Sequence, residues 1–380
     1  MSKEKGEKEI KPRKPRARRT SKKEAIPSPD LRYYDKLTDA GLQTRAAVSE
    51  AIERYPADVM LLSGGLDSSM LAALDPIPAI TVQIENRGTD LPHAQQTAEF
   101  LDIPWYPIVI SEGEAIASLP ELVAIHNSFD LAILNDIAVL QGIKYARSLG
   151  FSKICTGDGA DMAFCGYQYL WNPNRKEQLQ KEYPFMKPAS RKIGDKYEMG
   201  VGAPFLDPQV IDLVLSFDDD VLYSSFPSAT KTGDAMVEKA LGLTDEQLRL
   251  EYGDTMSNYL QRTLSQTQHM WGKLALRFAA KGMLPENIVW RQKTDLQFGS
   301  GADNIQEKLA AQITDEEFEA FKVEGYILYN KAHGALLKMF KEQGLKPPTP
   351  KDREFACKGC TGAVKNERNH CPTCGVYPAR

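Results

Sequence analysis

Residues 61–70 read Leu-Leu-Ser-Gly-Gly-Leu-Asp-Ser-Ser-Met. Val59 to Leu62 are apolar and predict the end of a buried strand, after which Ser63-Gly64-Gly65 allow the backbone to pass close to a ligand. A helix that begins near Asp67 would direct its free N–H groups and its dipole at phosphate. We therefore predict a pyrophosphate-binding loop; the alternative is a glycine turn between a core strand and a core helix. The predicted ATP-binding residues of this loop are Leu62, Ser63, Gly64, Gly65, Asp67, Ser68 and Ser69.

The loop differs from the Walker type, in which a Lys and a Ser or Thr follow the last glycine. Asp67 lies in that region instead. Because a carboxylate beside a triphosphate is repelled unless a cation lies between them, Asp67 indicates Mg²⁺ as well as ATP.

A second glycine turn follows the strand-like residues 153–155 and reads Thr-Gly-Asp-Gly-Ala-Asp over residues 156–161. It brings Gly157, Asp158 and Asp161 to the end of a strand, as in the first turn. Two turns at the carboxyl ends of neighbouring parallel strands can face one ligand. A carboxylate at position 158 could accept a proton from a nitrogen nucleophile, or could cap the following helix.

Two further motifs complete the pattern, Pro-Phe-Leu-Asp at 204–207 and Leu-Pro-Glu-Asn-Ile-Val-Trp-Arg-Gln-Lys at 284–293. In order and spacing, the four motifs resemble the synthetase domain of asparagine synthetase and β-lactam synthetase over about residues 50–305. The resemblance implies an α/β fold with a doubly wound parallel sheet of the pyrophosphate-loop type. It also implies an ATP-dependent ligase that forms AMP and pyrophosphate, adenylating a carboxylate and transferring it to ammonia or an amine.

The same resemblance implies roles for individual residues. Asp67 and Asp161 would ligate Mg²⁺, and Gly157 would contact ATP. Lys293 would stabilise negative charge during adenylation, and Asp158 takes the position of a glutamate that contacts the incoming ammonia. Lys273, Arg277 and Arg291 add cations nearby, although helical cations usually lie on solvated faces or pair with acids.

The chain departs from the family in several places. Met162 replaces an acid, and Gly200 and Gly202 replace the glutamate and arginine near the substrate amino acid, which argues against aspartate as the acceptor. A basic segment stands where the family has a glutaminase domain. We therefore expect nitrogen from free ammonia, from another amine or from a partner protein.

The secondary-structure pattern changes along the chain. Before residue 207, apolar strands alternate with amphipathic helices, which indicates a parallel sheet covered on both faces. After residue 207 we predict helices and no strand. The predicted strands are 59–62, 79–84, 105–110 and 153–156, and the predicted helices are 30–55, 68–74, 91–101, 114–127, 135–149, 210–215, 235–241, 245–264, 271–280, 305–313, 315–323 and 331–342.

Six cysteines divide into four and two. The four that form two CxxC knuckles predict a structural Zn²⁺ site in a zinc ribbon: Cys357, Cys360, Cys371 and Cys374. Because a proline-rich linker at 343–350 precedes the ribbon, we expect it to contribute little to the main core. Cys155 and Cys165 are expected to be buried as small hydrophobic residues.

Charge is distributed unevenly between the ends of the chain. Residues 1–30 carry eleven Lys or Arg and five Asp or Glu, which is a net charge of +6. The overall net charge is −4, so the remaining residues have a net charge of −10. We predict a disordered basic tail at 1–30, a synthetase domain at 31–345 and the ribbon at 351–380. The tail is either a solubilising arm or, with the ribbon, a contact for nucleic acid. No apolar run is long enough to span a membrane, so a cytoplasmic protein is expected.

Two other functions fit the same motifs. One is an enzyme that adenylates a base in tRNA or DNA, held by the tail and ribbon. The other is a non-catalytic ATP-binding scaffold, against which the combination of Asp67, Asp161 and Lys293 argues.

Overall fold

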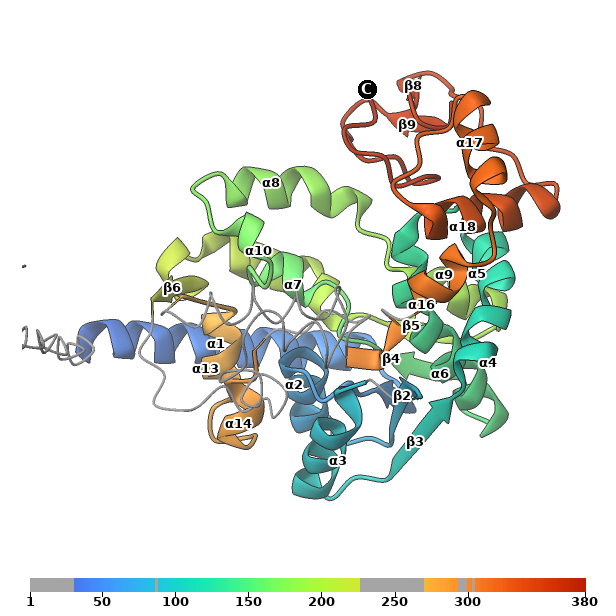
Figure 1. Cartoon of the computed structure of the whole chain (residues 1–380). Coiled ribbons are helices and arrows are strands. Elements are labelled where there is room, and N and C mark those ends of the chain that lie inside the picture. Colours follow the sequence, from blue (N-terminus) through green and yellow to red (C-terminus); the bar gives the residue numbers. More distant parts are fainter. Residues whose placement is uncertain (1–30, 86–87, 226–269, 293–298, 303–304) are drawn as a thin grey trace, which may run out of the picture.

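A computed structural model describes residues 31–85, 88–225, 270–292, 299–302 and 305–380 (Figure 1). The predicted tail, the predicted helices 235–241 and 245–264, and Lys293 lie outside the described residues. Among the described helices, none combines the length and apolar character needed to cross a membrane.

The centre of the molecule is a five-stranded sheet of order β3-β2-β1-β4-β5 in which every pair is parallel. This arrangement confirms the predicted parallel sheet, with helices on both of its faces. The strands are β1 (Val59–Leu61), β2 (Ala79–Ile84), β3 (Trp105–Ile110), β4 (Lys153–Cys155) and β5 (Gly200–Gly202).

Side-chain alternation along the strands divides the core into two hydrophobic clusters. Met60 and Leu62 belong to one cluster and Val59 to the other, because successive strand residues point to opposite faces. The first cluster includes residues of α1 (Leu31–Arg54), α2 (Leu66–Leu74), α3 (Asp90–Leu101), α7 (Ala160–Ala163), α8 (Arg175–Glu182), α10 (Pro208–Ser216), α13 (Leu274–Ala280) and α14 (Glu286–Val289). The second includes residues of α4 (Glu112–Ala117), α5 (Leu119–His126), α6 (Asp136–Ser148), α9 (Ala189–Lys196), α16 (Ile305–Ala310) and α18 (Lys331–Glu342).

The predicted helix 114–127 is two helices. Ser111 and Glu114 form a capping box that begins α4, and α5 restarts after Ser118. Pro120 lies in the first turn of α5, where its missing N–H costs no hydrogen bond. The helix α17 (Asp315–Val323) and α18 have the predicted bounds.

The expectation of no strand after residue 207 is wrong. β6 (Tyr223–Ser225) pairs antiparallel with β7 (Met270–Gly272), so Trp271 lies in a strand and α13 begins only at Leu274. Lys273 separates the two elements with φ of +58°. The short edge strand β5 is also additional to the prediction.

The ribbon consists of the hairpin β8 (Glu354–Ala356) and β9 (Ala363–Lys365), which Figure 1 shows next to α17 and α18. Its cysteines, Val364, Val376 and Ala379 belong to the second hydrophobic cluster, together with Phe340 of α18. The expectation that the ribbon contributes little to the core is therefore wrong. The domain boundary at 345–351 stays a prediction.

Candidate active site and metal centre

Gly64 determines how the first turn leaves β1. Its φ is +66°, and a Cβ there would lie 2.3 Å from the backbone nitrogen of Ala94 and 2.5 Å from the carbonyl carbon of His93. The turn is thus pressed directly against α3. Only glycine combines this left-handed backbone with so close an approach.

The serines of the turn hold its shape. The N–H of Ser63 donates to Ser68 Oγ at 3.1 Å, and the N–H of Gly65 donates to Ser63 Oγ at 3.2 Å. Ser69 is fully buried, with its hydroxyl 3.3 Å from that of Thr97 and its N–H bonded to the carbonyl of Gly65. Ser63 and Gly65 are half-buried at the turn, whereas Ser69 packs into the core; the phosphate-binding roles of all three stay predictions.

The two glycine turns lie against each other. A Cβ on Gly157 would be 3.2 Å from Cβ of Asp67 and 3.4 Å from the backbone nitrogen of Ser68. Leu62 ends the preceding segment in the core, where its carbonyl accepts a hydrogen bond from Thr81 Oγ1 at 2.6 Å. The predicted juxtaposition of these turns is therefore present in the structure.

Lys273 lies between the two predicted magnesium ligands. Its Nζ is 2.7 and 2.6 Å from the carboxylate oxygens of Asp67 and 2.8 Å from Oδ1 of Asp161. Lys273 is 5% exposed, so this charge is held inside the protein. Both carboxylates therefore point at one position that holds a cation. Mg²⁺ is bound by carboxylate oxygens, so Asp67 and Asp161 fit the ligands that this ion requires.

Arg277 of α13 is buried close to Asp67 and Asp161. Arg277 is buried beside the Trp271 ring, with its Cζ 4.7 Å from the centroid, and it donates to the carbonyls of Gly272 and Val289. Burial lowers the pKa of Arg277 to about 10, although Asp67 and Asp161 raise it. Arg277 and Lys273 are both buried, so neither lies on a solvated face; Lys273 pairs with acids, which is the other arrangement expected of such cations.

Arg291 connects the first turn to the start of α3. Its Nη2 is 3.1 Å from Oδ1 of Asp90, and its Nη1 donates to the carbonyl of Ser63 at 3.3 Å. It is 3% exposed. Lys293, two residues further on, is the predicted charge-stabilising residue and lies outside the described residues.

Asp158 is held by hydroxyl groups. Its Oδ2 accepts hydrogen bonds from Thr156 Oγ1 at 2.7 Å and from Ser190 Oγ of α9 at 2.5 Å. The N-cap of α7 is Gly159, without a side-chain hydrogen bond, so Asp158 does not cap this helix. Its role toward a nucleophile stays a prediction.

The departures from the family have simple local structures. Gly202 lies in β5, where a Cβ would be 3.1 Å from the carbonyl oxygen of Tyr55, and Gly200 is exposed at the start of the strand. Met162 accepts a hydrogen bond at Sδ from the hydroxyl of Tyr169. Met162, at the position where the sequence comparison expects an acid, thus has a hydrogen-bonding partner in a neighbouring tyrosine.

Cys155 and Cys165 are buried, as expected. Burial raises the pKa of each thiol to about 12. Neither is a thiolate near neutral pH, which disfavours sulfur transfer by these two residues.

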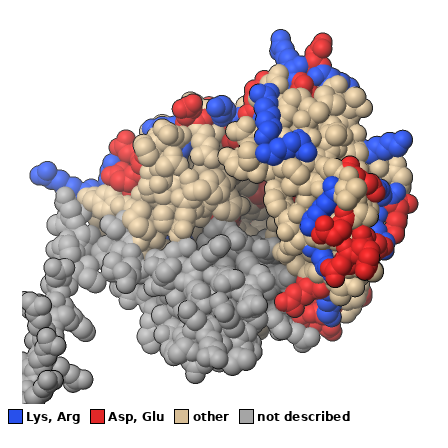
Figure 2. Space-filling model, turned by 45° about the horizontal axis from the view of Figure 1, so that its top comes forward, with Lys and Arg blue, Asp and Glu red and all other residues tan. Residues whose placement is uncertain are grey.

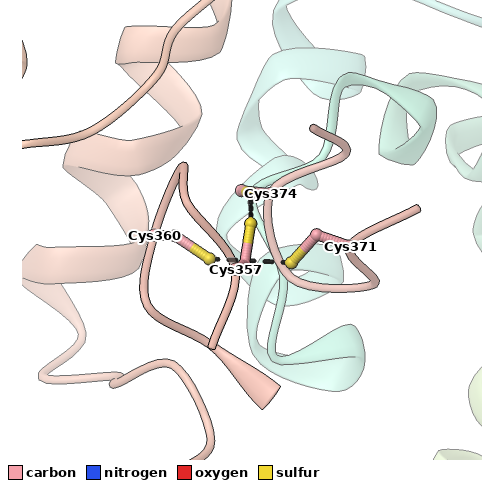
Figure 3. A group of neighbouring side chains, drawn as sticks. All are labelled: Cys357, Cys360, Cys371 and Cys374. Atoms are coloured by element: carbon pink, nitrogen blue, oxygen red, sulfur yellow. Dashed lines mark hydrogen bonds between the residues drawn. The ribbon is translucent and has the colours of Figure 1, made fainter. Parts of the chain in front are cut away.

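The four ribbon cysteines converge on one point (Figure 3). Their Sγ atoms all lie within 4.8 Å of one another, with 3.6 Å between those of Cys357 and Cys374 and between those of Cys360 and Cys371. A tetrahedral zinc with Zn–S bonds of about 2.3 Å separates its sulfurs by about 3.8 Å. The donor set and its size therefore fit a structural zinc ion.

This fold and geometry agree with the comparison to known families. Residues 43–200 match the asparagine synthase family. The match includes both glycine turns and stops before Gly202. Among curated proteins, the chain is 23% identical over 315 residues to a probable glutamine-hydrolysing asparagine synthetase of Dictyostelium discoideum, covering 73% of this chain and 51% of that protein.

A second relative is a putative glutamine-hydrolysing asparagine synthetase of Methanocaldococcus jannaschii, 26% identical over 271 residues, with 66% of this chain and 47% of the relative covered. The chain thus spans about half the length of these curated relatives. Among solved structures, NMN synthetase from Francisella tularensis aligns over 81% of this chain and 94% of that chain at 15% identity, with a TM-score of 0.32.

Proposed function

We propose that the chain is an ATP-dependent, AMP-forming ligase of the asparagine synthetase type. In this reaction a carboxylate oxygen of the acceptor attacks the α-phosphorus of ATP, and pyrophosphate leaves. Ammonia or an amine then attacks the acyl carbon, and AMP leaves with the former carboxylate oxygen. The observation that carries the proposal is the convergence of Asp67 and Asp161, from the two facing turns, on the buried Lys273.

The arrangement fits the charge changes of adenylation. Mg²⁺ held by Asp67 and Asp161 would neutralise pyrophosphate as it leaves. Lys273 would then be released from the carboxylates toward the phosphates, and Lys293 would add a second positive charge. The N–H groups at the start of α2 would complete the binding of the phosphates.

The nitrogen side is assigned to Asp158. Its carboxylate has one oxygen, Oδ2, held by two hydroxyls, so its orientation is fixed before substrate binds. A fixed carboxylate can accept the proton that ammonia or an amine loses as it attacks the acyl carbon. The acceptor differs from aspartate, because Gly202 offers no guanidinium to a second carboxylate.

Nucleobase adenylation receives less support. On the face drawn in Figure 2, Lys and Arg side chains of the described residues are interspersed with Asp and Glu. Continuous contact with a polyphosphate backbone favours a surface of one sign. Any contribution of residues 1–30 to nucleic-acid binding, or of a nitrogen-donor protein to the reaction, stays a proposal.

ATP–pyrophosphate exchange tests this function directly. The purified chain is screened with Mg²⁺ and with amino acids, dicarboxylic acids, free bases and tRNA, and the acceptor that stimulates exchange is the adenylated substrate. We expect a carboxylate to do so and ammonium to yield AMP and an amide in equal amounts. Stimulation only by tRNA or a base, or release of ADP instead of AMP, would refute the proposal.

A further inference from the structure

The second zinc knuckle makes a buried contact with a loop of the synthetase domain. The carbonyl oxygen of Thr373, between Cys371 and Cys374, accepts hydrogen bonds from the N–H of Phe129 at 2.8 Å and from Ser128 Oγ at 3.0 Å. Thr373, Ser128 and Phe129 are 2%, 4% and 0% exposed. A buried carbonyl with two donors fixes the loop relative to the metal centre more strictly than apolar packing alone.

The same contact continues at Asp130. The N–H of Asp130 donates to Ser128 Oγ at 3.2 Å, and its carboxylate lies 3.2 Å from Nε2 of His370 in the ribbon. A Cβ on Gly375 would lie 2.4 Å from Oδ1 of Asp130. The ribbon and the loop therefore meet with no space between them.

The loop leads to the nitrogen side of the site. His126, which ends α5, pairs with Asp136, which begins α6, with 3.2 Å between Nε2 and Oδ2. The carbonyl of His126 accepts a hydrogen bond from Lys192 of α9 at 3.4 Å, and Ser190 of the same helix holds Asp158. Figure 1 shows α5 and α9 together beneath the ribbon and α18.

Electrostatics connects the same groups. Burial raises the pKa of Asp136, the hydrogen bond and charge of His126 lower it, and the charges of Asp158 and Asp130 raise it further. Asp136 thus interacts with both Asp158 and Asp130 in a poorly solvated region. A shift of the loop would change the environment in which Asp158 works.

We infer that the zinc ribbon positions the nitrogen-accepting side of the active site: Thr373 and Ser128 hold loop 127–130, and this loop holds the His126–Asp136 pair opposite Asp158. Ser128 and Thr373 are positioning residues, and neither contacts the reacting atoms. The inference rests on the proposed function only for the role of Asp158; the coupling of the ribbon to the loop stands on the contacts alone.

Ser128→Ala in the full chain, loaded with zinc, tests the inference. The change removes the hydrogen bond to Thr373 and the acceptor for the N–H of Asp130 without touching a cysteine. We expect ATP–pyrophosphate exchange to stay within about twofold, while amide formation with ammonium chloride falls about tenfold and the KM for ammonium rises. Hydrogen exchange should increase across 127–136, with zinc content unchanged. Ser128→Thr, which keeps a hydroxyl, should restore amide formation.

Ser118→Ala is the matched control. Ser118 is also buried, but its hydroxyl donates to the carbonyl of Ala115 in α4, the helix that ends just before it. We expect both amide formation and hydrogen exchange at 127–136 to stay unchanged in this variant.

Unaltered amide formation and unaltered hydrogen exchange in Ser128→Ala would overturn the inference. Absence of AMP-forming exchange in the wild type would instead refute the proposed function, and hydrogen exchange at 127–136 then decides the coupling alone. If Ser128→Ala does not fold, zinc is removed from the wild type with a chelator. The coupling then requires loss of protection at 127–136 without loss in α1, and equal protection with and without zinc refutes it.

Discussion

The first glycine turn and the zinc ribbon are both short, glycine-containing segments, but their shapes have different origins. The turn at 63–65 is defined by a distant element, since Gly64 contacts Ala94 and His93 of α3. The ribbon is defined within a short span of sequence, because the four thiols lie between residues 357 and 374. The structure of a metal-binding motif can be predicted from sequence when its ligands are close together in the chain. For a turn that depends on distant contacts, the sequence indicates the motif but not the contacts that shape it.

Zinc removal should produce the largest effect. We expect about one zinc per chain, and Cys371→Ser should lose it, since three thiolates cannot close a tetrahedral site. The lost binding free energy is on the order of 10 kcal/mol. Metal analysis and hydrogen exchange should show zinc loss together with unfolding of 351–380 and loosening of α18.

Cys165→Ala is the control, because this buried thiol lies far from the ribbon in sequence and belongs to the other hydrophobic cluster. It should retain full zinc. A Cys371→Ser protein with a full complement of zinc would contradict the assignment of the zinc ligands. If protection from hydrogen exchange is lost only in 351–380, the core that the ribbon shares with α18 does not stabilise α18.

Gly64→Ala tests whether the turn depends on α3. The new side chain meets both a left-handed backbone and backbone atoms of α3, so we expect a loss of about 3 kcal/mol in the free energy of unfolding. Gly150 also has a positive φ, +88°, but a Cβ there has nothing within 4 Å. Gly150→Ala should therefore cost only about 1 kcal/mol. Equal losses in urea denaturation would remove the α3 contact from the explanation.

Lys273→Met tests the charge between the two turns. Turnover should fall by about 10²–10³, the scale of one lost electrostatic contact. Without Mg²⁺ the variant should also unfold more easily, because Asp67 and Asp161 lose their shared cation; added Mg²⁺ should recover much of that stability. Lys281→Met, which removes an exposed ammonium over the Tyr34 ring, serves as the control. Normal turnover in Lys273→Met would separate this lysine from the reaction.

Much of the fold follows from sequence because strand and helix periods are local. β1 to β4 and the bounds of α17 and α18 are predicted to within one residue. β5 is Gly-Val-Gly, which has no apolar alternation to mark it as a strand. β6 and β7 pair across dozens of residues, so neither has a signal by itself.

The site follows the same rule. The glycine turns, with Asp67 and Asp161, are visible as motifs, but the ion pair of Lys273 with Asp67 spans 206 residues. Lys273 also has a left-handed backbone conformation, which turns the chain from β7 into α13. Lysine rarely adopts this conformation, so the sequence does not indicate it. The docking of Thr373 on Ser128 is hidden for the same reason, since it joins residues 245 positions apart.

The smallest effect concerns Asp207 of the Pro-Phe-Leu-Asp motif, another residue whose role depends on a distant partner. Arg54 of α1 donates to both of its carboxylate oxygens at 2.9 Å, and Asp207 also caps α10 through the N–H of Gln209. Burial raises the pKa of Asp207, but the Arg54 and backbone hydrogen bonds outweigh it, and the net pKa is lowered. A lowered folded-state pKa gives stability that is present above the unfolded value, about 3.9, and is lost as pH falls through the folded value.

Arg54→Met should therefore destabilise the protein at pH 7, by less than the Gly64 change, since it leaves a buried carboxylate with fewer donors. The variant lacks the hydrogen bond that lowers the pKa of Asp207, so the difference from wild type should begin to shrink where Asp207 of the variant becomes protonated, and should be lost fully only below the lowered wild-type pKa. Arg45, on the same helix, donates to the carbonyls of Ala279 and Lys281. Because carbonyls do not titrate, the cost of Arg45→Met should be the same at both pH values. Urea denaturation at pH 7 and pH 3.5 measures both differences, and a pH-independent loss in Arg54→Met would show that Asp207 is stabilised by its helix cap and not by the arginine.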